Sequence, residues 1–255
     1  MEKLKVIKIG GNVIDNPDAL ERVLERFCAL PGAKILVHGG GAIANRALEK
    51  MGIVPKMIEG RRVTDAATLD VVTAIYAGLI SKKIVATLQK YGCNAAGISG
   101  ADCNALTSRK RPAEPIDYGF VGDIESVNCE AFSMFLEAGV TPVVCAINHD
   151  GEGTLLNTNA DTVASSIATA MSGLYDTSLI LCFEKDGVLA DKDDETSVIE
   201  TIDLVKYEQM KADGSVSAGM LPKLKNAFAA IHGGVREVII KNSENILNEK
   251  GTVIK

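Results

Sequence analysis

Short apolar runs alternate with amphipathic stretches along the whole chain. Consecutive apolar residues predict buried strands at residues 6–9, 33–37, 94–98, 141–147, 178–183, 238–241 and 252–254. Apolar residues at helical spacing predict intervening helices, among them residues 42–51, 129–138 and 204–212. This alternation predicts a three-layer α/β/α sandwich around a mainly parallel central sheet. In such a fold, functional sites lie at the carboxyl ends of the strands.

Short polar side chains indicate where several of these helices begin. Asn16 followed by Pro17 predicts a helix start, and Asn128 is a suitable cap for a later helix. Thr64 is predicted to cap a long helix with an apolar face. A break near residues 78–81 is expected to separate that helix from the next one.

Two of the predicted strands end in glycine clusters. Gly10-Gly11 follows the first strand, and Gly39-Gly40-Gly41 follows the second and leads directly into a helix. Glycine lets backbone N–H groups approach an anion because no Cβ stands in the way, and a helix N-terminus attracts negative charge. A lysine in a strand is usually a solvated edge residue, but Lys8 adds a positive charge beside the first cluster. Together these features predict one anion held between two loops.

Composition narrows the class of protein. The length of 255 residues allows one large domain or two modest ones, and 47% hydrophobic residues can fill their cores. The 24% of charged residues and the mean hydropathy of +0.15 are typical of a soluble globular protein. Lys and Arg total 27 against 33 Asp and Glu, giving a formal charge of −6, which argues against nonspecific nucleic-acid binding. Local charges must therefore hold any anionic substrate.

The cysteines and the apolar runs bear on location. Six scattered cysteines without a Cys-x-x-Cys pair indicate reduced thiols in a cytoplasmic protein. No signal peptide or membrane-spanning run is recognised, so no membrane association is expected. The chain has no Gly-x-x-x-x-Gly-Lys-Ser/Thr loop, which argues against P-loop nucleotide binding, and no histidine–cysteine cluster that would predict a metal site.

Three polar segments carry further candidate chemistry. Arg61-Arg62 could be a solvated pair, but an arginine just before a helix can also fork onto a carboxylate. Asn157-Thr158-Asn159-Ala160-Asp161 places polar groups on one side of an extended segment, or simply caps the next helix. Lys223 is predicted near a helix N-terminus, where the helix dipole disfavours a cation unless an anion binds between them.

These motifs occur in a specific order. They are Lys8-x-Gly10-Gly11, His38-Gly39-Gly40-Gly41, Gly60-Arg61-Arg62-Val63-Thr64, Asn157-x-Asn159-Ala160-Asp161 and Gly219-Met220-x-Pro222-Lys223. The set resembles the N-acetylglutamate kinases of the amino acid kinase family over essentially the whole chain. The first motif is common to that family, whereas the third and fourth together point to its N-acylglutamate branch.

The resemblance implies transfer of the γ-phosphoryl group of ATP to the side-chain carboxylate of N-acetyl-L-glutamate, in arginine biosynthesis. It implies ATP and Mg²⁺, with the metal bound mainly through nucleotide phosphates. It also implies an N-acylglutamate-binding and dimerisation lobe over residues 1–172 and an ATP-binding lobe over residues 173–255. A carboxylate acceptor is already deprotonated at neutral pH, so no general base is needed.

The resemblance further implies roles for single residues. Lys8 and Lys223 would flank the phosphoryl group, Arg62 would hold the α-carboxylate, and Asp161 would position both lysines. The implied catalytic residues are Lys8, Lys223 and Asp161; the substrate-binding residues are Gly40, Gly41, Arg62, Asn157 and Asn159; and the phosphate- or ATP-binding residues are Lys8, Gly10, Gly11, Glu184, Gly187, Gly219 and Lys223.

Some positions depart from the family's pattern and leave alternatives open. Ser217-Ala218-Gly219 stands where two glycines usually precede the methionine, and Glu184 stands where an aspartate is usual. Ile147-Asn148-His149 replaces a more usual Ile-Gly-Val. If that last segment lines the acyl pocket, the substrate could instead be N-succinyl-L-glutamate.

Two other functional classes remain as alternatives. Another amino acid kinase would act on free glutamate, aspartate, carbamate or UMP, and the residues Arg62, Asn157 and Asn159 argue against it. A non-catalytic amino-acid sensor is disfavoured by the intact charged residues Lys8, Asp161 and Lys223.

The resemblance also implies an assembly. Its arginine-inhibited members use an extra amino-terminal helix to interlace dimers into a hexamer. Here the first strand begins by about Leu4. The three residues before it are too few for such a helix, because globular helices typically need about 8 to 20 residues. A homodimer that is insensitive to arginine is therefore expected.

Overall fold

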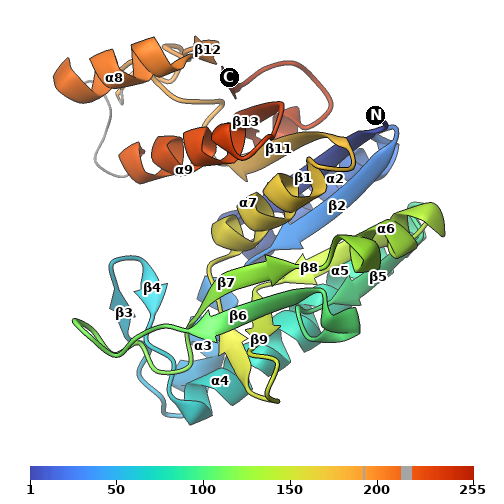
Figure 1. The fold of residues 1–255 in the computed structure, drawn as a ribbon, viewed down its shortest axis with the longest axis vertical. Helices are drawn as coiled ribbons and strands as arrows, with labels where there is room; N and C mark the ends of the chain where they lie inside the picture. The colour runs from blue at the N-terminus through green and yellow to red at the C-terminus, as the bar shows by residue number, and fades with distance from the viewer. Residues whose placement is uncertain (192, 214–219) are drawn as a thin grey trace.

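The computed structural model describes residues 1–191, 193–213 and 220–255 (Figure 1). Among these residues, eight strands form the main sheet in the order β12-β14-β13-β11-β1-β2-β8-β5. All neighbours pair in parallel except β13 and β14, so the prediction of a mainly parallel sheet is confirmed. The strands are β1 (Lys3–Ile9), β2 (Ala33–His38), β5 (Ala95–Ile98), β8 (Thr141–Cys145), β11 (Asp176–Phe183), β12 (Thr201–Ile202), β13 (Glu237–Asn242) and β14 (Thr252–Ile254).

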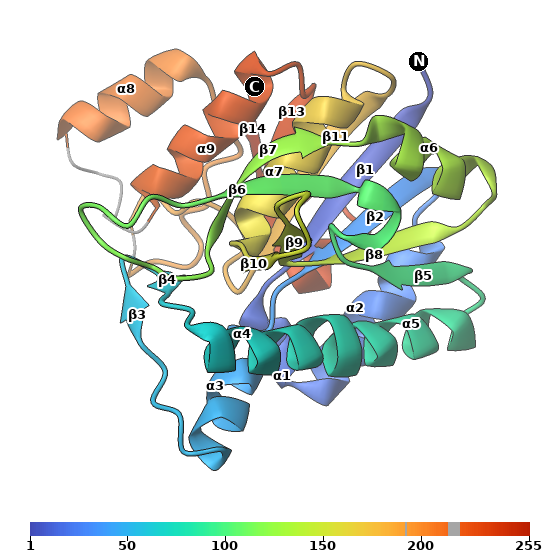
Figure 2. The ribbon, with the colours of Figure 1, turned by 60° about the horizontal axis from the view of Figure 1, so that its bottom comes forward.

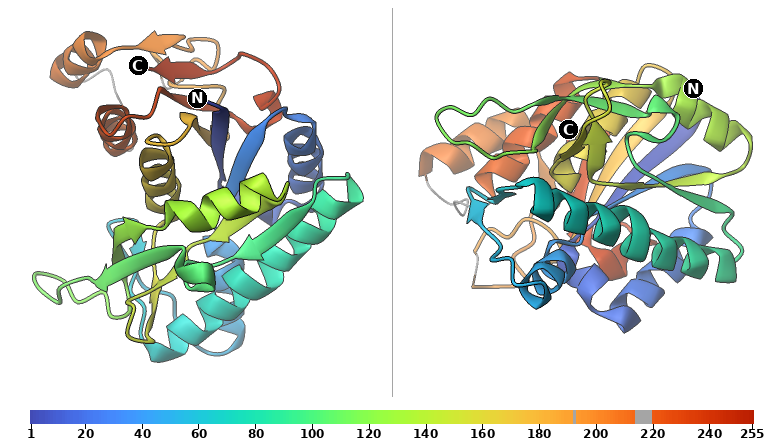
Figure 3. Two further views of the ribbon diagram at one scale, coloured as in Figure 1. Left: turned by 45° about the vertical axis from the view of Figure 1, so that its right-hand side comes forward. Right: turned by 90° about the horizontal axis from the view of Figure 1, so that it is seen from below.

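Helices cover both faces of this sheet, which confirms the three-layer sandwich (Figures 2 and 3). One layer holds α1 (Gly11–Asp15), α2 (Pro17–Ala29), α3 (Gly41–Lys50), α4 (Ala66–Thr73) and α5 (Ser81–Lys90). The other layer holds α6 (Cys129–Glu137), α7 (Ala160–Met171) and α9 (Leu221–His232), with α8 (Leu204–Asp213) packed beside α9. The predicted caps are confirmed at Asn16, whose side chain accepts from two backbone N–H groups, and at Asn128.

A second, smaller sheet was not expected from the sequence. Its order is β10-β9-β6-β7, with β6 (Leu106–Lys110), β7 (Gly122–Val127), β9 (Ile147–His149) and β10 (Leu155–Asn157). The strand predicted over residues 141–147 therefore ends at Cys145, and after Ala146 the chain enters the second sheet. A short hairpin of β3 (Met57–Ile58) and β4 (Arg61–Arg62) lies apart from both sheets.

The predicted helix break near residues 78–81 is wrong. Helix α4 continues through a π-helical segment (Ala74–Ile80) directly into α5. The cap is also wrong by one residue, because the Asp65 side chain accepts from the N–H of Thr68 at 2.7 Å. Thr64 is buried and its hydroxyl donates to the carbonyl of Arg62 instead.

This long helix corrects a second expectation. By length and composition, Ala66–Lys90 is long and apolar enough to cross a membrane, whereas the sequence suggested no such segment. Its inward side chains, including Val72, Tyr76, Ile84 and Leu88, are buried in the core of the sandwich. We therefore interpret it as a core helix.

The central strand β1 fixes the geometry of the site. It pairs in parallel with β11 on one side and β2 on the other, and Lys8 lies opposite Leu181 and Val37. Lys8 is therefore an interior strand residue near the carboxyl end of the sheet, not an edge residue. The loops after β1, β2 and β11 leave the sheet side by side.

A buried lysine stabilises the opposite end of the sandwich. The amino group of Lys34 donates to the carbonyls of Phe27, Cys28 and Leu30 at 2.9, 2.9 and 2.7 Å, at the C-terminus of α2. Lys34→Met should lower the free energy of unfolding by about 2 kcal/mol or more, because buried carbonyls lose their donor. Urea denaturation measures this. Lys83→Met, on an exposed face of α5, is the control. Equal midpoints for the two variants would contradict the prediction.

Candidate active site

Two cavities open at the carboxyl end of the sheet, and Lys8 and Gly11 line both of them. The β2-side cavity has a volume of about 200 Å³ and is also lined by Gly39, Gly40, Gly41, Met57, Gly60, Arg61, Arg62, Tyr76, Val121, Ala146, Asn157, Thr158, Asn159, Ala160 and Asp161. The β11-side cavity has a volume of about 370 Å³ and is also lined by Gly10, Asn12, Val13, Cys182, Phe183, Glu184, Lys185, Gly187, Met220, Lys223 and Ile240. A molecule in either cavity would thus reach the same amino group.

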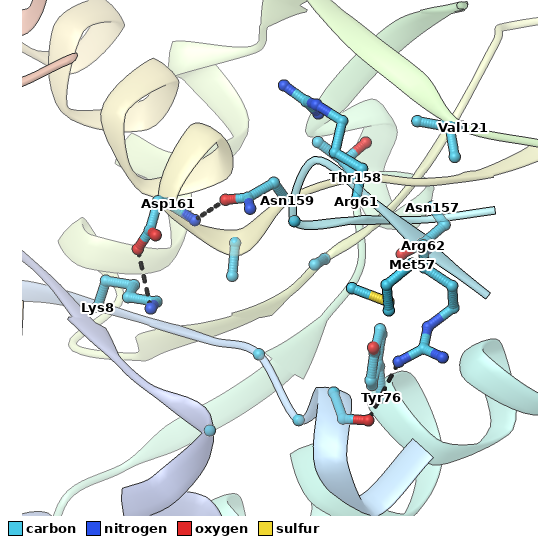
Figure 4. Close-up of a pocket in the computed structure, with 17 residues that line it drawn as sticks. Lys8, Met57, Arg61, Arg62, Tyr76, Val121, Asn157, Thr158, Asn159 and Asp161 are labelled. Carbon is cyan, nitrogen blue, oxygen red and sulfur yellow. Dashed lines mark hydrogen bonds and ion pairs between the residues drawn. The ribbon is translucent and has the colours of Figure 1, made fainter. Parts of the chain in front are cut away.

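The Lys8 side chain is held by an ion pair. Its Nζ lies 2.8 Å from Oδ1 of Asp161, and the two side chains are 10% and 31% exposed (Figure 4). Asp161 lies in the first turn of α7, where the helix dipole favours a negative charge. The lysine ammonium group has three donors, so the pairing leaves donors available to a bound anion.

Lys223 approaches from α9, in the helix layer that also holds α7. It lies in the first turn of α9, as the sequence predicts, and its Nζ stands 3.8 Å from the ring centroid of Phe183. The Lys8 Nζ lies 5.5 Å from the same centroid, so one aromatic ring at the end of β11 contacts both cations. Burial lowers the pKa of Lys223; the charge of Lys8 adds to this, while Asp161 and Glu184 oppose it.

The loop after β2 brings backbone donors to the β2-side cavity. Gly40 precedes α3 with φ of 143° and ψ of 27°, a conformation that other residues rarely adopt, and Gly41 is the first residue of the helix. The first N–H groups of a helix have no partner within the helix, so those of α3 are available at the cavity. A Cβ on Gly40 would also clash with the Ile80 side chain.

Arg62 is a buried cation without a carboxylate partner. It is 6% exposed, and in the described part of the chain no Asp or Glu lies within ion-pair distance of it. Its Nη2 donates to the carbonyl of Gly41 at 3.1 Å, while Nε and Nη1 are buried without a hydrogen-bond partner. Figure 4 shows the neighbouring Arg61 pointing in a different direction. A buried, unpaired guanidinium in a cavity is suited to bind an anion.

The two asparagines have distinct settings. The Asn157 Nδ2 donates to the Thr64 hydroxyl at 3.1 Å, and that hydroxyl donates to the carbonyl of Arg62, so Asn157 is linked to the end of β4. Asn159 caps α7, because its Oδ1 accepts from the N–H groups of Asp161 and Thr162. The cap reading of this segment is therefore confirmed for Asn159, and its Nδ2 group is left to face the cavity.

The structure gathers the predicted site residues around these two cavities. Lys8, Asp161, Gly40, Gly41, Arg62, Asn157 and Asn159 line the β2-side cavity, and Gly10, Gly11, Glu184, Gly187 and Lys223 line or share the other one. Gly219 and the departure at residues 217–218 lie outside the described residues. The placement gives the predicted roles a common location, and the roles themselves remain proposals.

Asn148 and His149, which the sequence suggested as possible lining of an acyl pocket, do not line the β2-side cavity. Asn148 is fully buried and its Nδ2 donates to the Thr158 hydroxyl at 3.0 Å, behind the cavity wall. The His149 Nδ1 accepts from the N–H of Gly151 in the β9–β10 turn. Of this part of the chain, Ala146 lines the cavity.

Sequence reasoning also missed two aromatic residues. Phe183 ends the predicted strand beside β1, and its position next to Lys8 could have been found by placing the two strands side by side. Tyr76 was assigned only to a buried helix face, yet it lines the β2-side cavity. Its apolar neighbours in the sequence gave no signal of that position.

The arrangement suits transfer between two anionic molecules. Cations and helix N-termini meet where the cavities share Lys8, and Asp161 reaches the amino group of that lysine. In the described residues, no group of three or more His, Cys, Asp or Glu could hold a metal ion. The charged side chains that line the cavities offer electrostatic neutralisation and positioning of such anionic molecules.

The chain is similar in sequence and fold to known proteins. The model of the amino acid kinase family matches residues 3–242. The chain is 49% identical to acetylglutamate kinase of Bacteroides thetaiotaomicron over 100% of the chain and 99% of the relative, and 51% identical to acetylglutamate kinase of Cytophaga hutchinsonii over 99% and 97%. Among solved structures, a Streptococcus mutans protein superposes with a TM-score of 0.81 at 27% identity, covering 99% of this chain and 98% of that one.

The electrostatics of the lysine pair can be measured directly. Lys223 should titrate below the ordinary value of 10.5, because burial and Lys8 both favour its neutral form. Asp161→Asn removes a charge that favours the protonated form, so this change should lower the pKa of Lys223 further. The ¹³Cε shift of Lys223, assigned with Lys223→Arg and followed against pH, measures both values. Asp150→Asn, in the remote β9–β10 turn, is the control. An unchanged pKa in Asp161→Asn would contradict the coupling.

Proposed function

This chain belongs to the amino acid kinase family, and we propose that it transfers the γ-phosphoryl group of ATP to the side-chain carboxylate of N-acetyl-L-glutamate. The observation that carries the proposal is the shared position of Lys8, whose amino group borders both cavities and pairs with Asp161. The full-length relatives named acetylglutamate kinase support the same acceptor. The reaction is a step of arginine biosynthesis.

The β2-side cavity is the proposed site for the amino acid. Arg62 supplies a buried positive charge for the α-carboxylate, and its free donors would be satisfied by that group. Asn157 and Asn159 line the same cavity and can orient the acylated amino group. The side-chain carboxylate then points towards Lys8 and the N–H groups of Gly40 and Gly41.

The transferred group is proposed to pass between the two lysines. Phosphoryl transfer needs in-line placement of acceptor and donor and neutralisation of charge on the moving oxygens. Lys8 supplies that charge from the central sheet and Lys223 from α9, and Asp161 keeps the first amino group in position. The acceptor oxygen attacks as a carboxylate, so no residue has to remove a proton from it.

The β11-side cavity is the proposed ATP site, lined by Gly10, Gly11, Glu184, Gly187 and Lys223. Mg²⁺ supplies charge neutralisation on the nucleotide phosphates when it is bound. Its ligands would be mainly phosphate oxygens and water. Residues 1–172 would then form the amino-acid lobe and residues 173–255 the nucleotide lobe, with the main sheet running through both.

The assembly and location are proposed from the family. We propose a cytoplasmic homodimer, with the exposed side of the helical segment from Asp65 to Ile80 as the pairing surface. That side includes Ala74 and Leu79, of which Leu79 is 43% exposed.

A substrate panel tests the reaction. ADP release should show the highest kcat/KM with N-acetyl-L-glutamate, because free amino acids leave the acyl-facing donors unpaired, and such losses cost large factors in specificity. The panel includes N-succinyl-L-glutamate, free glutamate, aspartate, carbamate and UMP. A preference for the succinyl compound would change the acyl group and keep the reaction. Comparable turnover of an unacylated acceptor would overturn the assignment.

The lysine shared by the cavities gives a second test. Lys8→Met should lower kcat by about 100-fold or more, the scale seen when transition-state charge stabilisation is lost. Lys3→Met, on the exposed start of the same strand, is the matched control and should leave kcat unchanged. Steady-state kinetics with circular dichroism on both variants measures this. Near-normal kcat in a folded Lys8→Met variant would remove Lys8 from the mechanism.

A further inference from the structure

Tyr76 reaches the substrate cavity from an unusual helix. It lies in the π-helical segment Ala74–Ile80, and π-helical turns within α-helices are frequent at functional sites. Its ring packs against Gly40, where two of its carbons lie 3.5 Å from the position of an added Cβ. The ring is therefore in ordinary van der Waals contact with the glycine loop, and Tyr76 lines the β2-side cavity with its hydroxyl beside Arg62 (Figure 4).

The hydroxyl of Tyr76 stands next to the guanidinium of Arg62 (Figure 4). The side chain is 6% exposed. Burial raises the pKa of Tyr76, and the charge of Arg62 together with hydrogen bonding to it opposes that rise only in part. The phenol is therefore neutral at physiological pH and keeps its proton.

The chemistry of the two groups fixes the direction of that proton. A guanidinium has donors and no acceptor, so towards Arg62 the phenol oxygen can only accept. The single O–H of the phenol must therefore point away from Arg62. Because the two groups are neighbours in the lining of one cavity, an oxygen bound by the guanidinium there would lie close to the phenol.

Most of the guanidinium of Arg62 has no hydrogen-bond acceptor among the described residues. One of its nitrogens donates to the carbonyl of Gly41, and the other two lack hydrogen-bond partners. A carboxylate has two oxygens with about four acceptor sites, so one oxygen can accept from the guanidinium while it also accepts from a phenol. The pair thus forms a three-donor seat for a carboxylate.

We propose that Tyr76 is a substrate-binding residue whose hydroxyl donates a hydrogen bond to the α-carboxylate held by Arg62. This inference rests on the proposed function, because it takes N-acetyl-L-glutamate as the ligand. Tyr76 then contributes to the affinity for the acceptor and to the requirement for an α-carboxylate. It has no part in the binding of ATP, because it lines only the β2-side cavity.

Tyr76→Phe removes the hydroxyl and keeps the ring against Gly40. Loss of a hydrogen bond to a charged group should weaken N-acetyl-L-glutamate binding about tenfold or more, measured as Kd by calorimetry and as KM in the kinase assay. The KM for ATP and kcat should stay within about twofold of the wild type, since the transferred group is contacted elsewhere. Tyr91→Phe is the matched control. Tyr91 directly follows α5, at the C-terminal end of the same long helix, and its hydroxyl donates to Glu21.

A truncated ligand identifies the contacted group. 4-Acetamidobutanoate keeps the acetamido group and the side-chain carboxylate but lacks the α-carboxylate. Its inhibition constant should be the same in the wild type and in Tyr76→Phe. An equal loss of affinity for both ligands would overturn the α-carboxylate contact, and an unchanged Kd for N-acetyl-L-glutamate would overturn any role for the hydroxyl. If the wild type itself fails to bind N-acetyl-L-glutamate, the proposed function fails with it.

Discussion

Lys8, Lys223 and Arg62 bring three positive charges to one end of the sheet, and Asp161 pairs with only the first of them. Buried or half-buried cations with little negative charge nearby have a cost in free energy. That cost falls when anionic ligands bind, because phosphates and carboxylates then supply the missing partners. The surrounding structure can be understood as the means of holding these charges in place without neutralising them.

Each cation is held in place by a different element. Lys8 is fixed by a strand with neighbours on both sides, and the helix dipole of α7 stabilises the carboxylate that pairs with it. Lys223 rests on the ring of Phe183, which attracts a cation and cannot neutralise it. Arg62 donates to the uncharged carbonyl of Gly41, so its full charge remains available.

Much of this site could be predicted from the sequence because its parts are local motifs. Glycine clusters, helix caps and charged residues next to them are visible within a few positions, and the parallel topology brings their ends together. The errors concern tertiary context. The π-helical segment at residues 74–80 kept a helix continuous where Gly78 suggested a break, and the passage from β8 to β9 moved Asn148 behind the cavity wall. Tyr76 escaped notice because a cavity-lining phenol and a core tyrosine have the same helical spacing.

The place of Lys8 on a doubly paired strand also constrains how such a protein can diverge. Backbone pairing with β2 and β11 prevents β1 from shifting towards one cavity without shifting away from the other. A substitution that adjusts Lys8 for a new molecule in one cavity would therefore change its position in the other cavity as well. Changes of acceptor are expected to accumulate in segments that border the β2-side cavity alone, such as β4, the π-helical turn and residues 157–159. The shared lysine would stay fixed while the specificity around it evolves.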